Sequence, residues 1–367
     1  MTNLENTAKT SFSGSYGPND VTFLLTRLAS ADVRNVADKE AHIQRGGHYS
    51  EVLSAESAPA AEYVELFRQQ LASQGERLAS HLVKLASSIA ARVSTGPITL
   101  VSLARAGTPV GVLLHRVLAE RFDREVTHYS VSIIRDRGLD LNALRHILTK
   151  HADTSVVFVD GWTGKGVIGA ELRRSVEAFN KAEGVAVNPD LFVVADIAGT
   201  AAVSATREDY LIPSAILNAT VSGLVSRTVM DSRLAANDFH GCLYYEGLAH
   251  VDCSVEFVDA VWQHLVSRDL AAPAPAETVS TVNAKDLHDM VERYRVLHNL
   301  ASVNFVKPGV GEATRVMLRR VPRMLVLRDL EDQEVAHLLM LARQKCVPVT
   351  MDPVLPCRAL AIIEQLD

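Results

Sequence analysis

The sequence predicts an α/β protein with an open parallel sheet, followed by a small C-terminal α/β/α domain. Its length of 367 residues suggests about two domains. One stretch rich in alanine and proline, residues 270–277, separates two regions in which strands and helices alternate. We therefore expect a first domain over residues 1–269, a linker, and a second domain over residues 278–367.

In the first region, apolar runs typical of buried strands are separated by helical segments. The expected strands are 98–103, 126–134, 155–160 and 191–196, and the expected helices are 109–122, about 139–150 and 167–179. Strands joined through helices run parallel, with helices on both faces of the sheet. Ligands of such sheets bind beyond the carboxyl ends of the strands, so the loops there form the candidate site.

The second region repeats this alternation on a smaller scale. The expected helices are 284–300, 311–321, 332–346 and 357–366, and the expected strands are 303–309, 323–329 and 347–351. This order predicts a compact α/β unit.

Composition places the chain among ordinary folded proteins. Hydrophobic residues make up 48%, yet no apolar run is long enough for a membrane helix. The N-terminus is polar and lacks the features of a signal peptide, and the four cysteines form no CxxC pair. We expect a cytoplasmic protein with no membrane partner.

Charge is distributed unevenly along the chain. The net charge is −6, whereas residues 285–367 hold 12 basic and 11 acidic side chains. Residues 313–328 contain five arginines and no acid. Such a basic face on an acidic protein favours a phosphate-bearing partner, and the alternative is a solvated helix face.

The loops after the first two strands carry arginines. Arg105, Ala106 and Gly107 follow the first strand, where Gly107 lets the backbone approach a ligand and the next helix offers free N–H groups to an anion. Arg135 and Arg137 follow the second strand. They are suited to gripping phosphate groups, and the alternative is ordinary surface charge.

The loop after the third strand carries the strongest signal. A buried strand ends at Asp160, and the next residues, GWTGKG, lead directly into a helix. Thr163, Gly164, Lys165 and Gly166 would hold a phosphate through backbone N–H groups, a hydroxyl and an ammonium group. The spacing fits neither a Walker A loop nor GxGxxG. An acid beside a phosphate-binding turn suits a sugar phosphate.

These loops resemble those of the type I phosphoribosyltransferases. The resemblance implies a phosphoribosyltransferase-like fold and the substrate phosphoribosyl pyrophosphate (PRPP), with Mg²⁺. It implies that Asp160 binds the ribose hydroxyls, that residues 163–166 hold the 5′-phosphate, and that residues 105–107 hold pyrophosphate.

The same resemblance implies catalytic roles. Asp160 and three arginines, Arg105, Arg135 and Arg137, would act as pyrophosphate departs, with the arginines neutralising its charge. Gly161 stands where the family usually has a second acid, and the loop is shorter than usual. Both departures favour a modified site or one that binds without turnover.

Four further stretches, 12–25, 38–53, 209–229 and 238–248, resemble a bacterial phosphoribosyltransferase-like subfamily found in tellurite-resistance and stress gene clusters. In the third stretch, Asn218, Ser222 and Arg227 are candidates to bind an acceptor, and the alternative is a helix cap with a core network. In the second stretch, three side chains are expected to lie over the site and form a hood: His48, Tyr49 and Glu51.

Some relatives in that subfamily carry a cysteine protease label. Cys242 follows His240 by two residues, and Asp238 is near. Catalytic partners usually come from distant segments, and a buried structural role for Cys242 is the simpler interpretation.

The second domain resembles the Pelota-like RNA-binding module, through residues 307–329. The resemblance implies RNA contacts by Gly311, Glu312 and Arg315, and the basic run adds Arg319 and Arg320. Structured RNA is the expected partner. The alternative is that this unit packs on the first domain, or forms a homodimer contact, with its arginines paired to acids there.

Three functions follow from the sequence. The leading expectation is a PRPP-dependent phosphoribosyltransferase that acts on a base, a nucleoside-like metabolite or RNA in a tellurite or stress response. The alternatives are a non-catalytic regulator that binds PRPP or a nucleotide and associates with RNA, and a cysteine peptidase.

Overall fold

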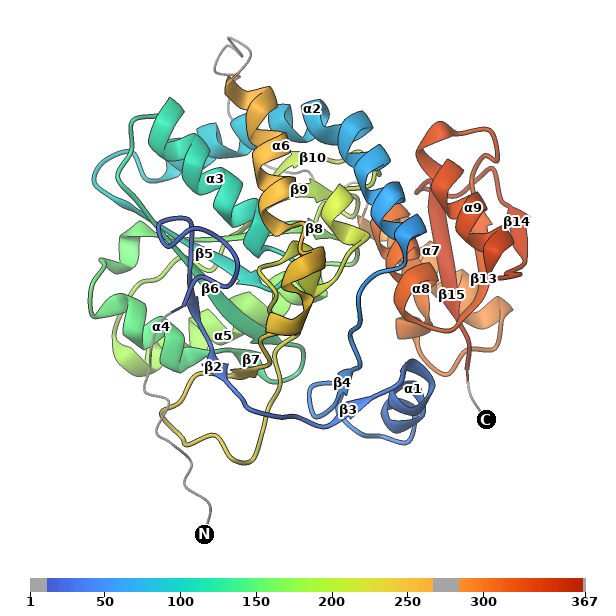
Figure 1. The fold of residues 1–367 in the computed structure, drawn as a ribbon, viewed down its shortest axis with the longest axis horizontal. Helices are drawn as coiled ribbons and strands as arrows, with labels where there is room; N and C mark the ends of the chain where they lie inside the picture. The colour runs from blue at the N-terminus through green and yellow to red at the C-terminus, as the bar shows by residue number, and fades with distance from the viewer. Residues whose placement is uncertain (1–11, 267–283, 366–367) are drawn as a thin grey trace.

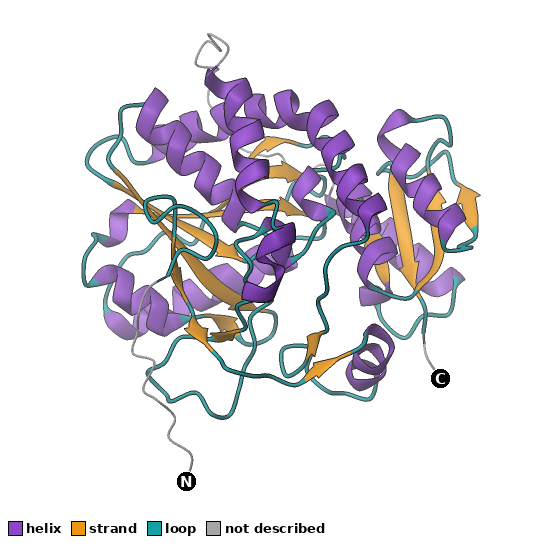
Figure 2. Cartoon of the chain, in the orientation of Figure 1, coloured by secondary structure: helices purple, strands orange, loops and turns teal. Residues whose placement is uncertain are grey.

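The computed structural model describes residues 12–266 and 284–365, drawn in Figure 1 from blue to red. The predicted linker, residues 270–277, lies outside the described residues. The chain forms a large α/β domain and a smaller C-terminal α/β domain beside it (Figures 1 and 2).

The first domain is built on a parallel sheet with the strand order β1-β6-β5-β8-β9-β10. Its strands are β1 (Thr22–Leu24), β5 (Ile98–Ala104), β6 (Val126–Ile134), β8 (Val156–Thr163), β9 (Leu191–Asp196) and β10 (Val203–Thr206). A short β7 (Gly138–Leu139) pairs antiparallel with β6. The predicted parallel sheet is therefore confirmed, with two further edge strands that the sequence did not reveal.

Helices cover both faces of this sheet (Figure 2). One face carries α2 (Ala61–Arg92), α3 (Thr108–Arg121) and α6 (Ser254–Val266), and the other carries α4 (Leu141–Leu148) and α5 (Val167–Glu183). The small elements α1 (Val36–Gln44), β2 (Thr26–Arg27), β3 (Val33–Arg34), β4 (Leu53–Ser54) and β11 (Gly241–Cys242) lie in the long connections. Of these, α1, β3 and β4 lie next to the smaller domain (Figure 1).

The C-terminal domain has a four-stranded sheet with the order β12-β15-β13-β14. Its strands are β12 (Val306–Pro308), β13 (Pro322–Leu327), β14 (Val349–Met351) and β15 (Ala359–Ile363). Helix α7 (Ala284–Leu297) packs on one face of this sheet. Helices α8 (Val310–Arg319) and α9 (Ala336–Gln344) cover the other face.

One predicted element of this domain is wrong. Residues 357–366, expected to form a last helix, instead contain β15, which pairs antiparallel with both β12 and β13. All five residues of β15, ALAII, are buried. A short apolar run buried on both faces of a sheet has no alternation that would distinguish it from a buried helix.

The apolar core continues from one domain into the other. Val316 and Met317 of α8 belong to the same cluster of buried residues as Leu211 and Ala215 of the first domain. The two domains are therefore packed together through a shared core. No helix in the described part of the chain is long and apolar enough to span a bilayer.

Candidate functional site

A cavity of about 600 Å³ lies where the carboxyl edge of the large sheet meets α8 of the C-terminal domain. We call it the junction pocket. Its charged lining consists of eight cations (Lys39, Arg105, Arg135, Arg227, Lys307, Arg315, Arg319, Arg320) and four acids (Glu40, Glu56, Asp160, Glu312). When all of these groups are ionised, the lining has a surplus of four positive charges in a protein whose net charge is −6.

Three of the arginines are paired with acids of the chain. Arg105 lies 2.7 Å from Glu56, and its side chain also donates to the Asn218 amide oxygen at 3.2 Å. Arg320 forms two hydrogen bonds with Glu40 of α1, and Arg315 lies 3.1 Å from Glu312. These pairs neutralise part of the lining.

Two other arginines bind carbonyl oxygens. Arg319 donates to Ala215 and Leu217 at 2.7 and 2.6 Å, and Arg227 donates to Val52 at 2.7 Å and to Tyr49. Carbonyl groups hold these guanidinium groups in place but do not neutralise them.

Arg135 and Lys307 have no such partner. Among the described residues, neither side chain makes a hydrogen bond or an ion pair, and Nε of Arg135 is buried. Both line the pocket and are only partly exposed. A buried polar group without a partner is costly, so the pocket is suited to a ligand that supplies negatively charged acceptors.

Burial shifts the protonation equilibria of the pocket. Desolvation raises the pKa of Asp160 to about 7, and it lowers the pKa of Lys39 and of Lys307 to about 7. Burial opposes ionisation of Glu312 as well, but the charges of Arg315 and Lys307 outweigh it and hold that pKa at about 2. The pocket therefore becomes more positive as the pH falls through neutrality.

The predicted phosphate-binding turn, residues 163–166, is engaged with the C-terminal domain. Lys165 donates to the carbonyl oxygens of Val303 and Val306 at 2.8 and 3.3 Å. The Thr163 hydroxyl accepts the N–H of Gly166 at 3.1 Å. A Cβ atom at Gly164 would lie 3.3 Å from Glu312. Phosphate binding by this turn stays a prediction, while the structure places it in the contact between the domains.

The other predicted residues divide into two groups. Arg105, Ala106, Arg135, Asp160, Asn218, Ser222, Arg227 and the α8 residues Glu312, Arg315, Arg319 and Arg320 all line the junction pocket. Arg137 is half exposed and is not part of the lining. Gly107 lies against Asp160, and Gly311 lies against Trp162. The structure thus brings together most residues of both predicted sites in one cavity.

The predicted hood contacts the second loop. The Tyr49 hydroxyl accepts the N–H of Arg135 at 2.6 Å, and a ring nitrogen of His48 lies 3.1 Å from the Arg135 carbonyl oxygen. Glu51 is half exposed. These contacts fix the backbone from which the Arg135 side chain projects.

Five charged or aromatic lining residues were not singled out from the sequence. They are Lys39, Glu40, Glu56, Trp162 and Lys307. Two of them, Lys39 and Glu40, lie in the stretch 38–53, whose polar composition without clean periodicity was the available signal.

The cysteines do not form a reactive pair with histidine. Cys242 is fully buried, and burial raises its pKa to about 12. His240 instead contacts the hydroxyl of Ser132 at 2.8 Å, while its backbone N–H donates to Asp140. In the described residues, the junction pocket is lined by no cysteine. The thiolate is the nucleophilic form, so this arrangement disfavours attack by Cys242.

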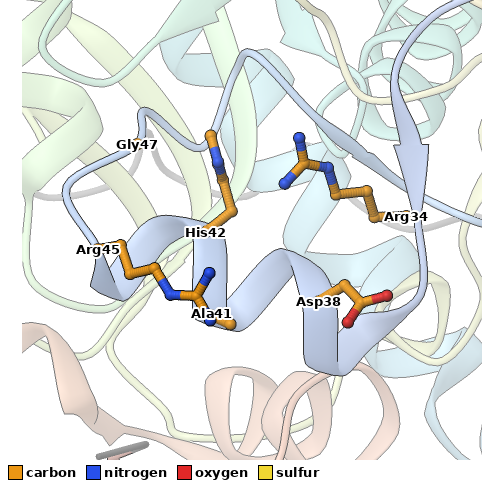
Figure 3. A pocket seen from close by; sticks show the side chains of 6 residues that line it. All are labelled: Arg34, Asp38, Ala41, His42, Arg45 and Gly47. Carbon is orange, nitrogen blue, oxygen red and sulfur yellow. The ribbon is translucent and has the colours of Figure 1, made fainter.

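A second hollow, of about 560 Å³, lies on the side of α1 (Figure 3). Arg34, His42 and Arg45 line it together with Asp38. Arg34 is paired with Asp32 at 2.7 Å, and His42 lies 3.5 Å from Glu51. Because Asp32 already neutralises Arg34 and Glu51 lies near His42, the hollow is a weaker candidate than the junction pocket.

Comparison with known proteins identifies the family. Residues 14–262 match the family described as "Tellurite-like stress resistance cysteine protease StiP". A protein of Acinetobacter baylyi (strain ATCC 33305 / BD413 / ADP1) named "Cysteine protease StiP" is 38% identical over 371 residues, which cover 98% of this chain and 96% of the relative. This chain belongs to the StiP family. Residues 284–365 match the PELOTA RNA binding domain.

These findings correct the leading functional expectation. The expected PRPP-dependent phosphoribosyltransferase is overturned, because the StiP family and the relative that matches along the whole chain are named for a cysteine protease. Cysteine peptidase was the last of the three functions expected from the sequence. The tellurite-stress association and the Pelota RNA-binding domain are confirmed.

The correction of the function does not decide whether the expected Mg²⁺ binds. Within residues 12–266 and 284–365, no three His, Cys, Asp or Glu side chains are grouped to hold a metal ion. The resemblance implies that Mg²⁺ binds together with a phosphate-bearing ligand and not to the chain alone. The Mg²⁺ therefore stays a prediction.

Proposed function

We propose that this chain serves a tellurite-like stress response by binding a small ligand with several negative charges, such as a phosphorylated metabolite, in the junction pocket. The observation that carries the proposal is the surplus of cations, two of which, Arg135 and Lys307, make no hydrogen bond or ion pair among the described residues. The volume of about 600 Å³ is within the range of small-molecule sites.

The residue types favour phosphate-like groups over a single carboxylate. Six of the eight cations are arginines, whose planar guanidinium groups bind phosphate oxygens in pairs. They converge from both domains, so a ligand with several charged oxygens can contact both. Binding would then also stabilise the contact between the domains.

The test is calorimetric titration of the full chain with inorganic pyrophosphate at constant ionic strength. We expect binding by the wild type, and a loss of about tenfold or more in affinity for Arg135→Gln and for Lys307→Met, since each removes one unpaired charge. Arg137→Gln is the matched control. It removes the same charge two residues away from Arg135, outside the lining.

Two results would refute the proposal. One is a wild-type protein that takes up no pyrophosphate at millimolar concentration. The other is equal affinity for Arg135→Gln and Arg137→Gln, which would mean that the charge of the whole surface, and not the pocket, attracts the anion.

A second candidate function is peptidase activity, because the StiP family description and the relative's name include it. In the described residues no thiol is paired with a histidine, so this activity requires a rearrangement that brings a cysteine and a histidine together. Casein or gelatin digestion by the wild type that disappears with Cys242→Ala, and not with Cys346→Ala, would establish this activity and assign the nucleophile.

A further inference from the structure

We infer that the first domain masks an RNA-binding face of the C-terminal domain, and that structured RNA binds this face only when the two domains separate. The α8 face consists of the N-terminus of α8 with Arg315, Arg319 and Arg320. The inference does not depend on a ligand in the junction pocket.

The N-terminus of α8 is occupied by an acid of the first domain. The Asp209 carboxylate accepts the backbone N–H groups of Val310 at 2.7 Å and of Arg358 at 2.8 Å. Free N–H groups at a helix N-terminus attract phosphate. Asp209 therefore stands where a nucleic-acid phosphate would otherwise bind.

The arginines of α8 are occupied in the same way. Glu40, whose side chain is only 3% exposed, takes both hydrogen bonds of Arg320, and the carbonyl oxygens of Ala215 and Leu217 take those of Arg319. Oxygens of the first domain thus take the hydrogen bonds that these two guanidinium groups make, while Nε of Arg319 stays buried without a partner among the described residues. These oxygens of the first domain occupy the hydrogen bonds that phosphate oxygens of an RNA would otherwise accept.

The closeness of the two domains excludes RNA from this face. A Cβ atom at Gly309, where φ is +91°, would lie 2.7 Å from Ile197 and 3.2 Å from Asp209. Arg315 lies over the ring of Trp162, 5.5 Å from its centre. The remaining cavity of about 600 Å³ has room for a small molecule, not for a folded RNA.

The kind of partner follows from the charge and from the domain match. Residues 313–328 hold five arginines and no acid within a segment that matches an RNA-binding domain. Binding through such a face releases counterions, so its affinity falls with salt. We expect a structured RNA recognised mainly through its backbone.

A reversible tether between the domains tests the inference on the full chain. Because a Cβ atom at Gly164 would lie 3.3 Å from Cγ of Glu312, the pair Gly164→Cys and Glu312→Cys is within disulfide reach. Cys346→Ser is included, since Cys346 is exposed. Binding of a fluorescent RNA stem-loop with an internal kink is measured by anisotropy, before and after reduction.

We expect the oxidised protein to bind this RNA at least tenfold more weakly than the same protein after reduction. The Cys346→Ser protein without the pair, treated with the same oxidant and reductant, should show no change. In the reduced form, Arg319→Ala with Arg320→Ala should weaken binding and flatten the salt slope by about one unit per lost contact.

A variant with a weakened contact between the domains provides the converse test. Glu40→Gln with Glu334→Gln removes two acids that pair across the domains, with Arg320 and with Arg77, and removes no arginine. We expect faster hydrogen exchange at the Val310 amide and RNA binding at least tenfold tighter than wild type. Equal binding by oxidised and reduced forms, faster exchange without tighter binding, or no salt-dependent RNA binding by any form would each overturn the inference.

Discussion

Glu56 lies 2.7 Å from Arg105 inside the junction pocket, and the two side chains are only 10% and 13% exposed. An acid of the chain therefore already neutralises a guanidinium group that faces the cavity. An incoming anion has to compete with Glu56 for this arginine. The pair sets how strongly the unliganded pocket attracts negative charge.

Replacing Glu56 with glutamine should tighten anion binding. Glu56→Gln leaves Arg105 uncompensated, and we expect about tenfold higher affinity for pyrophosphate by calorimetry, with a lower Tm for the unliganded protein. Glu62→Gln, an exposed site on α2, removes the same charge away from the pocket and serves as the control. Unchanged affinity in Glu56→Gln would show that Arg105 does not face the ligand.

Anion affinity should fall as the pH rises from 6 to 8. Over this range Lys39 and Lys307, each with a pKa of about 7, lose protons, and Asp160, also with a pKa of about 7, becomes charged. All three changes make the pocket less positive. Sulfate is the probe because its own charge stays constant across this range.

We expect a loss of about tenfold in sulfate affinity between these pH values, measured by calorimetry at constant ionic strength. Lys307→Met should bind more weakly at pH 6 and show a flatter profile. Asp160→Asn should retain more affinity at pH 8 than the wild type. A profile that is flat in the wild type contradicts the assignment of these groups to the pocket.

The sequence predicted best the features that follow from residues close together in the chain. The parallel sheet and the polar loops at its carboxyl edge were predictable, because alternating strands and helices leave few topologies and such loops meet at one edge. Arg105, Arg135 and Asp160 accordingly line one cavity. The remaining boundaries differed by a few residues, as expected where helix ends fray.

What could not be predicted depends on contacts between distant segments. The pairing of Arg320 with Glu40 joins residues 280 positions apart, and no local pattern indicates it. The arginine run 313–328 suggested an RNA contact, with pairing to acids of the first domain as the alternative. Tertiary packing turned Arg319 and Arg320 toward the first domain, where Arg320 pairs with Glu40. Strand β15 was mistaken for a helix for a similar reason, since its partners β12 and β13 decide its conformation.

Removing the Asp209 carboxylate should destabilise the chain. Asp209→Ala leaves the N–H groups of Val310 and Arg358 without their acceptor in a buried site. We expect the free energy of unfolding in urea at pH 7 to fall by about 2–4 kcal/mol, the cost of two unsatisfied donors.

Burial raises the pKa of Asp209 to about 6, so the charged form carries a cost above that pH. Because this folded-state pKa lies above the usual value for an aspartate, that cost is absent well below pH 4, grows as the pH rises from about 4 to about 6, and is constant above that. Asp209→Asn, which keeps one acceptor without the charge, should lose less stability than Asp209→Ala at pH 8. Asp289→Ala, at an exposed site on α7, should change nothing measurable.

Thiol labelling should separate the exposed cysteine from the three buried ones. Cys346 is exposed, whereas burial raises the pKa of Cys242 and Cys357 to about 12 and that of Cys253 to about 11. We expect Ellman's reagent to react rapidly with one thiol per native chain and with four after unfolding in guanidinium chloride. Cys346→Ser should abolish the rapid phase. A rapid phase that instead persists in Cys346→Ser and disappears in Cys242→Ser would mean that Cys242 is accessible and reactive in the native protein. That result would support peptidase activity with Cys242 as the nucleophile.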